Sequence, residues 1–376
     1  MRNIRAAVVG TGFIGVVHVE ALRRLGVEVT GIVGSSFERA TARSEAENLP
    51  APYPSFEAML ADERVDVVHL ATPNNVHDAQ VRACLAAGKH VVCEKPLAMT
   101  AAETGELLRL AEQSGLVHAV NFNIRFYPQC QEARARVRDG EIGDVRLITG
   151  GYLQDWLLLD TDWNWRLDPA AGGALRAVGD IGSHWLDLVQ FITGRHVEAV
   201  LADLTTFIPV RRQPTGPVET FSTAVAEDTV DTAMETEDAA GILVRLTGGA
   251  RGVMTVSQVS AGRRNRLSWE IDGSASSLAW QSEAPEELWI GHRGRPNELL
   301  VSERGDYPPG HAEGFPDTFK HLYRAVYRAV AAGGPPTEPD YPTFADGHEE
   351  AVIGEAIGRS HAEQRWVSVT AVPQEV

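Results

Sequence analysis

The chain has 376 residues, 44% of them hydrophobic, and a formal net charge of −17. This length is enough for two domains, and the composition is that of a globular rather than a disordered protein. An acidic chain without a basic stripe argues against binding to nucleic acid or to an anionic membrane surface. We therefore expect a globular protein whose partners are small molecules.

Cysteine usage and apolar runs bear on where the protein works. The three cysteines, Cys84, Cys93 and Cys130, are few, odd in number and not spaced as zinc ligands. This pattern is typical of a reducing compartment and predicts no disulfide framework. The first strand is expected from Ile4, which leaves no room for a signal peptide, and no apolar run is long enough to span a bilayer. We expect a cytoplasmic protein.

A glycine-rich turn, Gly10-Thr11-Gly12-Phe13-Ile14-Gly15, stands near the start of the chain. The apolar run before it predicts a buried strand, and apolar residues at helical spacing after it predict an amphipathic helix. In this setting the pattern G-x-G-x-x-G is typical of a dinucleotide site, where free N–H groups at the helix start bind the pyrophosphate. Gly10 permits the turn, Gly12 the approach of the pyrophosphate, and Gly15 the packing of helix on strand. The alternative is a turn without a ligand, and we favour the nucleotide site.

The end of the second predicted strand, residues 27–33, bears on the choice of cofactor. NAD-binding proteins commonly have an acidic residue here that holds the ribose 2′-hydroxyl. This chain instead has Gly34, followed by Ser35, Ser36 and Arg39. Two hydroxyls and a guanidinium suit a 2′-phosphate, so we expect NAD(P) as cofactor with a slight preference for NADP. The alternative is a serine that caps the next helix, with Arg39 in solvent.

The rest of the N-terminal domain, residues 1–123, alternates strands with helices. Strands are expected at 66–71, 90–93 and 116–121, and helices at 77–87 and 100–114, the last opened by a Thr100/Glu103 capping box. This order predicts an α/β Rossmann domain with a doubly wound parallel sheet. Thr72-Pro73-Asn74 and Glu94-Lys95-Pro96 both follow strands, at the edge where such sheets bind ligands.

The C-terminal domain, residues 124–376, has a different pattern. Several of its strand-like stretches alternate polar and apolar residues, which predicts an α+β domain with a large, mainly antiparallel open sheet. These stretches are 145–154, 197–207, 241–246, 252–260, 267–272, 277–281 and 288–290. Helices are expected at 180–192, 315–330 and 344–363, a hairpin turn at Gly248-Gly249, and surface loops at 209–220 and 291–309.

Three residue types suggest an alcohol dehydrogenation. Asp180 and His184 are four apart, so on a helix the carboxylate could orient the imidazole. Histidine suits the base that removes a hydroxyl proton, and Lys95 could offset negative charge on the substrate oxygen. The alternatives are a solvated lysine and a structural Asp–His pair. Asp180, His184 and Asp187 could bind a metal by ligand type, but no motif places a further ligand, so we expect none.

A tryptophan-rich segment follows the first strand of the second domain. Aromatic faces beside carboxylates and a guanidinium suit a polyhydroxylated ring, although a surface loop packed by its own tryptophans is the alternative. The segment contains Asp155, Trp156, Asp160, Asp162, Trp163, Trp165 and Arg166.

Taken in order, these motifs resemble the Gfo/Idh/MocA family, the relatives of glucose–fructose oxidoreductase and inositol dehydrogenase. The resemblance rests on five segments: the glycine turn, Ala71-Thr72-Pro73-Asn74, Glu94-Lys95-Pro96-Leu97, Asn121-Phe122-Asn123-Ile124-Arg125, and Gly179-Asp180-Ile181-Gly182-Ser183-His184-Trp185-Leu186-Asp187. Residues 152–156 and the pair Trp165-Arg166 look most like the levoglucosan dehydrogenase group.

The resemblance implies hydride transfer between NAD(P) and a secondary hydroxyl of a sugar, anhydrosugar or polyol, in a cleft between the domains. It implies a catalytic trio of Lys95, Asp180 and His184, with the proton carried by Lys95 or by His184, and a cis peptide before Pro96. It implies cofactor contacts from Gly10, Gly12, Phe13, Ile14, Gly15, Ser35, Ser36, Arg39, Ala71, Thr72, Pro73, Asn74, His77, Glu94, Lys95, Asn123, Trp165 and Arg166. It implies substrate contacts from Lys95, Arg125, Tyr152, Gln154, Asp155, Trp163, Asp180 and His184.

Two other functions remain open, as does the assembly. The same fold supports a glycoside hydrolase that uses NAD for transient oxidation, and a redox-silent sugar sensor is a third hypothesis. Family members pair through the C-terminal sheet, so we expect a homodimer or homotetramer. We expect Val253, Val259 and Leu267 on the exposed side of that sheet.

Overall fold

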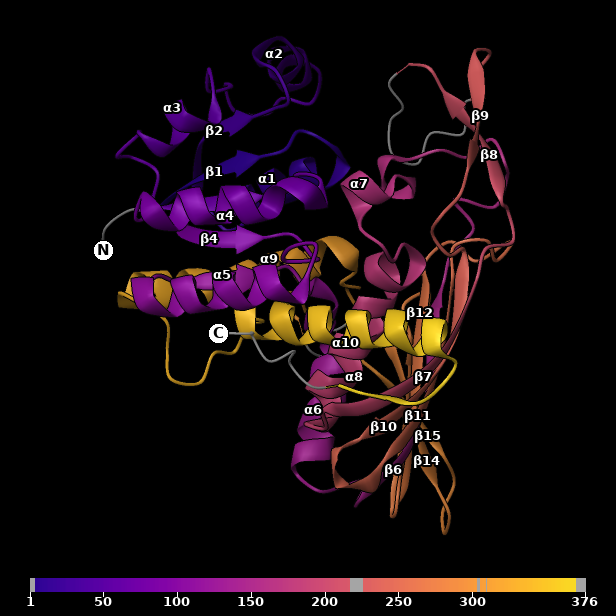
Figure 1. Cartoon of the computed structure of the whole chain (residues 1–376). Helices are drawn as coiled ribbons and strands as arrows, with labels where there is room; N and C mark the ends of the chain where they lie inside the picture. Colours follow the sequence, from indigo (N-terminus) through magenta and orange to yellow (C-terminus); the bar gives the residue numbers. More distant parts are fainter. Residues whose placement is uncertain (1–3, 217–225, 303–304, 309, 370–376) are drawn as a thin grey trace. The chain divides into compact units, whose positions relative to one another are not determined.

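The computed structural model describes residues 4–216, 226–302, 305–308 and 310–369, and the chain forms two compact units. The first unit comprises residues 4–123 and Phe315–Ala351, and the second comprises Ile124–Gly314 and residues 352–369. A division of the chain at Asn123 alone would assign Phe315–Ala351 to the second domain. Both units are drawn in Figure 1, coloured from indigo at the N-terminus to yellow at the C-terminus.

The first unit is built on a five-stranded parallel sheet with the order β2-β1-β3-β4-β5, as the alternating pattern predicts. Its strands are β1 (Arg5–Val9), β2 (Glu28–Val33), β3 (Val67–Leu70), β4 (His90–Cys93) and β5 (His118–Val120). Every residue of β3 is buried, which is typical of a parallel strand covered on both faces. From β1 the chain passes to β2 on one side, and from β2 it crosses back to β3 on the other side of β1, so the carboxyl end of β1 lies at a topological switch point.

Helices follow the strands of the first unit in the order that the sequence predicts. They are α1 (Phe13–Arg24), α2 (Phe37–Ala46), α3 (Phe56–Leu60), α4 (His77–Ala86), α5 (Ala101–Ser114), α9 (Phe315–Ala332) and the first part of α10 (Phe344–Glu363), with a 3-10 turn η1 (Asn74–Val76) before α4. The expected capping box opens α5: Thr100 Oγ1 accepts the Glu103 N–H at 3.2 Å, and Glu103 Oε2 accepts the Thr100 N–H at 3.0 Å.

The second unit contains a nine-stranded sheet with the order β15-β14-β13-β12-β6-β11-β10-β7-β16. All neighbours are antiparallel except β11 and β6, which confirms the mainly antiparallel sheet. The strands are β6 (Val145–Leu153), β7 (Val197–Thr205), β10 (Ala239–Leu246), β11 (Arg251–Ser257), β12 (Arg266–Gly273), β13 (Ser276–Gln281), β14 (Glu287–His292), β15 (Glu298–Val301) and β16 (Val367–Ser368). The hairpin between β10 and β11 turns at Gly248-Gly249, as predicted.

The helices of the second unit are α6 (Pro128–Arg138), α7 (Pro169–Gly172), α8 (Ser183–Thr193) and the rest of α10, with short turns η2 (Asn123–Phe126) and η3 (Trp165–Leu167). Of these, α6 and α8 pack against the sheet. The helix expected from Asp180 instead begins as a π-helical turn, η4 (Val178–Gly182), which leads directly into α8. Trp185 of α8 donates its indole N–H to the Ser268 carbonyl on β12 at 3.0 Å, which fixes α8 on the sheet.

The expectation of surface loops at 209–220 and 291–309 is wrong in part. The first range contains β8 (Val210–Pro214), which pairs with β9 (Thr229–Ala233) in a two-stranded ribbon, and the second contains β15. Residues 217–220 lie outside the described part of the chain. The ribbon escapes a hydrophobicity pattern because its fully buried residue is Arg211, a charged one.

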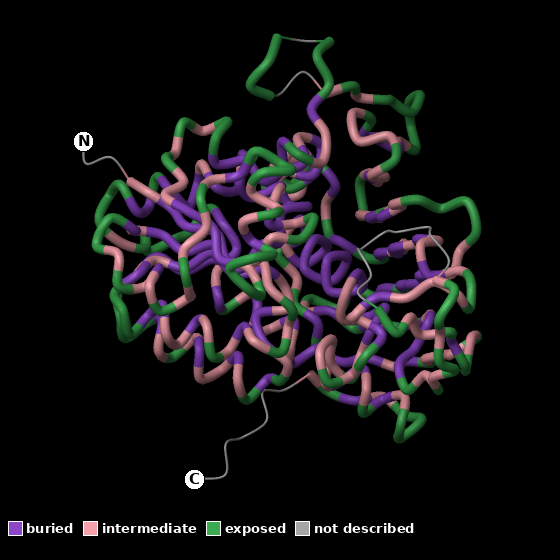
Figure 2. The backbone as a smooth tube through the Cα atoms, turned by 90° about the horizontal axis from the view of Figure 1, so that it is seen from above, coloured by how far each residue is buried: buried purple, intermediate pink, exposed green. Residues whose placement is uncertain are grey.

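One face of the second sheet is buried and the other is open. Buried and exposed residues alternate along most of β10 and β11. Figure 2 colours the backbone by burial, with buried residues in purple and exposed residues in green. Leu267, Trp269 and Ile271 of β12 are buried, so the expectation that Leu267 lies on the exposed side is wrong. Its register neighbours place it on the helix-covered face, whereas Val253 of β11 is 41% exposed. Within the described residues, no helix combines the length and apolar content needed to cross a bilayer.

His118 of β5 predicts a pH dependence of stability. Its Nδ1 accepts the backbone N–H of Phe344 at 3.2 Å, and burial lowers its pKa from 6.5 to about 4. The unfolded chain takes up a proton near pH 6.5, but the folded unit does not until about pH 4. Stability is therefore lost as the pH falls through this window, by about 3 kcal/mol for this group.

His118→Asn keeps an acceptor near the position of Nδ1 and cannot titrate. We expect the free energy of unfolding of this variant to fall less between pH 7 and pH 4 than that of the parent, measured by urea denaturation. The exposed His311→Asn is the control and should follow the parent. Equal pH slopes for His118→Asn and the parent would contradict this role of His118.

Candidate active site

The motifs of the first unit meet along one edge of its parallel sheet. The glycine turn follows β1, Ala71-Thr72-Pro73 follows β3, and Glu94-Lys95-Pro96 follows β4. Because neighbouring parallel strands share a direction, their carboxyl ends lie on the same side. This edge is where open α/β sheets bind ligands.

The reason for a glycine differs among the three positions of the turn. Gly10 has a φ of +111°, and a Cβ there would overlap the Ala71 carbonyl oxygen. A Cβ at Gly15 would overlap the carbonyl oxygen of Gly10. A Cβ at Gly12, in contrast, meets no atom within 4 Å. Backbone packing therefore requires Gly10 and Gly15, whereas Gly12 borders open space at the N-cap of α1, where no side chain caps the helix. That arrangement fits a pyrophosphate.

His77 ties two of these strand ends together. Its ring is fully buried, with Nδ1 2.8 Å from the Pro96 carbonyl oxygen and Nε2 2.9 Å from that of Thr72. Burial lowers the pKa of His77, which leaves one ring N–H for the two carbonyls at neutral pH. The peptide bond between Lys95 and Pro96 is cis, as the resemblance implies. His77 therefore holds the Thr72 and Pro96 segments at a fixed separation.

At the end of β2, Ser36 caps the next helix, which is the second of the two interpretations of these serines. Ser36 is the N-cap of α2, and its Oγ accepts the backbone N–H of Arg39 at 3.2 Å. A Cβ at Gly34 would lie 2.9 Å from the Cβ of Ala40, so an acidic side chain at that position would have to displace α2. The ribose-binding acid is absent because the strand and helix pack too closely there. The side chain of Arg39 is exposed and leaves the cofactor preference open.

Glu94, next to Lys95, ends a buried hydrogen-bonded column. His18 Nε2 donates to Glu94 Oε1 at 3.0 Å, and Asn121 Nδ2 donates to the same oxygen. The Nδ1 atoms of His18 and His69 are 3.1 Å apart, and His69 Nε2 is 3.1 Å from the hydroxyl of Tyr327.

Within this column, Glu94 is negatively charged and His69 is neutral. Burial alone raises the pKa of Glu94, but the hydrogen bond from His18 and the charges of His18 and Lys95 outweigh it and lower that pKa. Burial holds the pKa of His69 well below its usual value, so this ring is neutral. Glu94 is thus a buried carboxylate, and its Oε2 also accepts the Lys95 backbone N–H at 3.3 Å.

In the second unit, Asp180 lies on η4 and His184 in the first turn of α8. Asp180 Oδ1 accepts from Arg166 Nε at 3.1 Å, and its Oδ2 accepts from Gln258 Nε2 at 2.8 Å. The Arg166 guanidinium also lies over the ring of Trp165, 4.5 Å from its centroid. The two oxygens of Asp180 thus accept hydrogen bonds from Arg166 and Gln258, two residues that the spacing of Asp180 and His184 does not reveal.

His184 lies near a cluster of polar side chains from β6. Its ring centroid is 6.3 Å from that of Tyr152, whose hydroxyl donates to Asn265 Oδ1 at 2.6 Å. Gln154 Nε2 donates to the same oxygen at 3.0 Å, and Gln154 Oε1 accepts from Trp156 Nε1 at 2.9 Å. Asn265 belongs to no sequence motif. It comes next to Tyr152 and Gln154 because β12, which starts at the following residue, pairs with β6.

Other predicted site residues have structural partners within their own unit. Arg125 forms a buried bidentate ion pair with Asp187, with Nε 2.8 Å from Oδ2. Asp155 accepts the Gly262 N–H at 3.0 Å, and Asn123 Nδ2 donates to Thr318 Oγ1 at 2.7 Å. Trp163 is partly exposed. The Arg125 pair explains Asp187 of the motif as an anchor of α8.

Lys95 thus belongs to the first unit, and Asp180 and His184 to the second. Each unit orders its own part of the predicted trio, and the trio as a whole stays a prediction.

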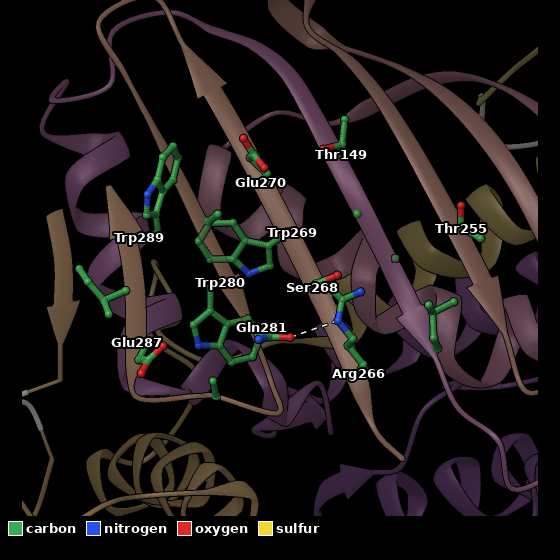
Figure 3. A pocket seen from close by; sticks show the side chains of 16 residues that line it. Thr149, Thr255, Arg266, Ser268, Trp269, Glu270, Trp280, Gln281, Glu287 and Trp289 are labelled. Atoms are coloured by element: carbon green, nitrogen blue, oxygen red, sulfur yellow. Dashed lines mark hydrogen bonds between the residues drawn. The ribbon is translucent and has the colours of Figure 1, made fainter. Parts of the chain in front are cut away.

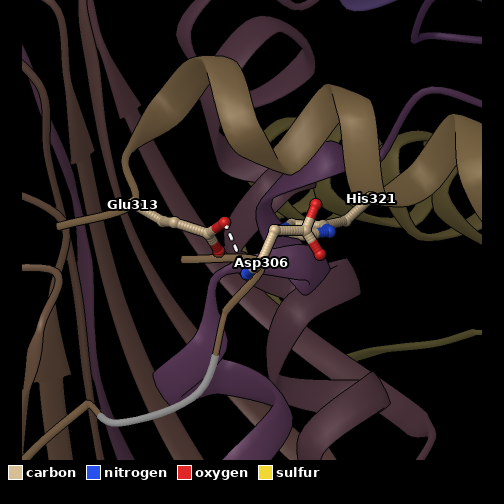
Figure 4. A group of neighbouring side chains, drawn as sticks. All are labelled: Asp306, Glu313 and His321. Atoms are coloured by element: carbon tan, nitrogen blue, oxygen red, sulfur yellow. Dashed lines mark hydrogen bonds between the residues drawn. The ribbon is translucent and has the colours of Figure 1, made fainter. Parts of the chain in front are cut away.

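Figure 4 shows the segment before α9, where an acidic side chain accepts a backbone hydrogen bond from the same loop. Glu313 is buried, and its Oε1 accepts the backbone N–H of Asp306 at 3.0 Å. His321, also drawn, lies on α9 of the first unit. We assign no metal site to these side chains.

A pocket of about 600 Å³ lies on the open face of the second sheet, away from Asp180 and His184. Figure 3 shows Thr149 of β6, Arg266 and Glu270 of β12 and Trp289 of β14 along its floor. Arg266 Nε donates to Gln281 Oε1 at 3.1 Å. None of the predicted catalytic residues lines this pocket.

Comparisons with known proteins agree with both halves of this structure. A model described as "Oxidoreductase family, NAD-binding Rossmann fold" of the GFO/IDH/MocA group matches residues 4–122, and the GFO/IDH/MocA C-terminal domain matches residues 130–279. Levoglucosan dehydrogenase of Pseudarthrobacter phenanthrenivorans is 28% identical over 99% of this chain and 100% of its own. D-xylose 1-dehydrogenase (NADP(+)) 2 of Haloferax volcanii is 30% identical over 71% of this chain and 80% of its own.

Solved structures give the same result. An oxidoreductase domain protein from Kribbella flavida superposes with a TM-score of 0.89 at 30% identity, covering 98% of this chain and 100% of that one. Levoglucosan dehydrogenase in complex with NADH and L-sorbose superposes with a TM-score of 0.88 at 28% identity, covering 99% of this chain and 100% of that one.

The open space at Gly12 predicts that a substitution there weakens cofactor binding without changing the stability of the fold. Gly12→Ala should fold with the thermal stability of the parent, because the new methyl group meets no protein atom, yet it should weaken NADH binding at least tenfold by occupying the approach of the pyrophosphate. Titration of intrinsic fluorescence with NADH measures this. Gly358→Ala, which also meets no atom, is the control. Unchanged NADH affinity in Gly12→Ala would mean that the phosphates bind elsewhere.

Proposed function

Because the chain belongs to the Gfo/Idh/MocA family of NAD(P)-dependent sugar oxidoreductases, we propose that it transfers hydride between the nicotinamide and a secondary hydroxyl of a sugar, anhydrosugar or polyol. The observation that carries the proposal is the shared sheet edge, where the open position at Gly12 follows β1 and the segment Glu94-Lys95-Pro96 follows β4, with β3 between the two strands. The names of the relatives, levoglucosan dehydrogenase and D-xylose 1-dehydrogenase, support a carbohydrate substrate.

The proposed chemistry assigns a role to each member of the trio. Nicotinamide, when bound, supplies the hydride acceptor, so the protein must remove the hydroxyl proton and hold the oxygen as it becomes a carbonyl. Lys95 offers an ammonium beside the buried Glu94 carboxylate and offsets charge on that oxygen. His184 offers an imidazole, and either it or Lys95 accepts the proton. Asp180, held by Arg166 and Gln258, supplies a fixed carboxylate.

Cofactor turnover separates this function from the hydrolase and sensor hypotheses. A dehydrogenase accumulates one reduced nicotinamide for each sugar oxidised. A hydrolase that oxidises its substrate transiently returns the hydride and accumulates no reduced nicotinamide. A sensor binds sugar and neither oxidises nor hydrolyses it. Absorbance at the nicotinamide band, with sugars, inositols and anhydrosugars tested against both cofactors, distinguishes the three.

Substitutions of the trio test the catalytic assignment. We expect Lys95→Ala and His184→Ala each to lower kcat by about 10²–10⁴-fold, because each removes a group that acts on the hydroxyl proton or on the charge of the oxygen. Asp180→Asn should cost less if Asp180 orients its neighbours. NADH affinity should change little in all three, and the exposed His311→Ala is the control. Near-normal turnover in both alanine variants would place the chemistry elsewhere.

We propose a slight preference for NADP. No acid stands at the end of β2, Arg39 is exposed one turn into α2, and one relative is named for NADP(+). Arg39→Ala should weaken NADPH binding by several-fold more than NADH binding, because only NADPH presents a 2′-phosphate to the guanidinium. Arg109→Ala, an exposed arginine of α5, is the control. Equal loss for both cofactors, or a parent that binds NADH and no NADPH, would overturn the preference.

We also propose a homodimer or homotetramer formed through the open face of the second sheet. Leu243 and Val253 face each other across β10 and β11 and are both 41% exposed, and the pocket of Figure 3 lies on the same face. Light scattering at micromolar concentration should give a dimer or tetramer, and Val253→Glu should shift it towards monomer. Val230→Glu, on the ribbon, should not. A monomeric parent would contradict the proposal.

For the location we propose the cytoplasm. Cys84, Cys93 and Cys130 are all free and buried. Burial raises the pKa of each thiol, which keeps them unreactive. Free thiols in the core suit a reducing compartment.

A further inference from the structure

We propose that Gln258 is a positioning residue for the reaction: its side-chain amide joins a buried arginine–aspartate network to Asp180 and presents a donor to that carboxylate. All of the contacts that support this proposal lie within the second unit. Its catalytic readout rests on the proposed dehydrogenase function, and a spectroscopic readout does not.

The network begins with one carboxylate shared by two arginines. The side chains of Arg176, Arg211 and Asp238 are fully buried, and Asp238 Oδ1 accepts from both guanidinium groups, at 2.8 Å from Arg211. Arg211 also donates to the carbonyl oxygens of Leu159 at 2.7 Å and Leu157 at 2.9 Å. Buried charges are rarely left unpaired, and Asp238 supplies the carboxylate that pairs with both guanidinium groups.

The residue before Asp238 fixes the backbone that carries Asp180. Glu237 accepts the backbone N–H of Arg176 at 3.1 Å and that of Val178 at 2.8 Å. These groups stand at the start of η4, the π-helical turn that contains Asp180. Because π-helical turns are rare and are frequent at functional sites, the outside partner that holds the start of this one bears on the site. The dipeptide Glu237-Asp238 is that partner here.

The orientation of the Gln258 amide follows from its neighbour. Arg176 NH1 lies 3.3 Å from Gln258 Oε1, and a guanidinium can only donate, so the amide oxygen must face Arg176. The amide nitrogen then faces Asp180 and donates to Oδ2 at 2.8 Å. The backbone of Gln258 is held by the same network, because its N–H donates to the Asp238 carbonyl at 3.0 Å. Gln258 is fully buried and has no other orientation that satisfies both contacts.

Asp180 therefore meets donors at both oxygens. Arg166 Nε occupies Oδ1 and Gln258 Nε2 occupies Oδ2, and neither group can accept a proton from it. Titratable or charged groups of this unit near Asp180 include Arg166 on η3 and Tyr152 on β6, and His184 follows one turn later on α8. Arg176 is linked to Asp180 through Gln258. Burial raises the pKa of Tyr152, which keeps it neutral.

Gln258→Glu reverses one element of this arrangement. The new carboxylate can still pair with Arg176, but its other oxygen faces Oδ2 of Asp180. Two carboxylates at that distance repel each other when both are ionised, so the pair takes up a shared proton as the pH falls. Gln258→Met keeps the volume and removes both hydrogen bonds without adding a charge. Gln213→Glu on β8 is the control for the charge change, because Gln213 only accepts from the Thr232 hydroxyl, at 2.9 Å.

The experiment measures kcat and KM from pH 6 to pH 8 and NADH affinity by fluorescence for the parent and the three variants. We expect Gln258→Glu to lower kcat about 10²-fold at pH 8, with NADH affinity within twofold of the parent. The ratio of its kcat to that of the parent should rise at least tenfold between pH 8 and pH 6. Gln258→Met should lose about tenfold at every pH, and Gln213→Glu should match the parent.

Infrared spectroscopy supplies a readout that needs no substrate. In Gln258→Glu the C=O stretch of a protonated carboxylic acid should appear at a pH where the parent lacks it, and Gln258→Glu combined with Asp180→Asn should shift its titration. A parent without turnover on any sugar would count against the proposed function, while this band would still support the role of Gln258.

Two results would overturn the positioning role. One is a kcat within threefold of the parent for both Gln258 variants. The other is an equal, pH-independent loss in Gln258→Glu and Gln258→Met with no carboxylic acid band, which is the behaviour of a residue that only supports the fold. If Gln258→Glu does not fold, as judged by circular dichroism, Gln258→Met decides by its kcat at unchanged NADH affinity.

Discussion

The first unit depends on two backbone approaches that leave no room for a side chain. Gly10 abuts the Ala71 carbonyl oxygen, and Gly15 abuts that of Gly10. These approaches bring the start of α1 close to the carboxyl ends of β1 and β3, so that its uncapped N–H groups face the same edge as the segment after β4. Of the three glycines of this turn, Gly12 borders open space, so its lack of a side chain has no packing reason. This is the reason for proposing that the phosphates bind there.

Buried polar networks hold the catalytic motifs in both units. In the first, the His18–His69 column fixes the Glu94 carboxylate next to Lys95. In the second, Asp238 and its two arginines fix Gln258 and through it Asp180. Such networks add little net stability compared with apolar packing, but they permit few arrangements. Both networks therefore serve geometry at the proposed site more than they serve the stability of the core.

Local patterns in the sequence were enough for the parallel sheet, the glycine turn and the Thr100 capping box, because each depends on residues close together in the chain. Leu267 was assigned to the wrong face, because alternation alone does not say which face the helices cover. The β8–β9 ribbon was missed because Arg211, a charged residue, is its anchor. Gln258 and Asn265 had no signal at all: their partners Asp180 and Tyr152 are 78 and 113 residues away.

Hydride transfer is the central claim, and an isotope label tests it most directly. The protein is incubated with oxidised cofactor and a panel of sugars, anhydrosugars and inositols deuterated at their carbinol carbons, and the nicotinamide is analysed by mass spectrometry. We predict reduced cofactor that carries one deuterium, together with an equal amount of the oxidised sugar. Deuterium lost to solvent without accumulation of reduced cofactor, or a cleaved glycosidic bond in its place, would contradict a dehydrogenase.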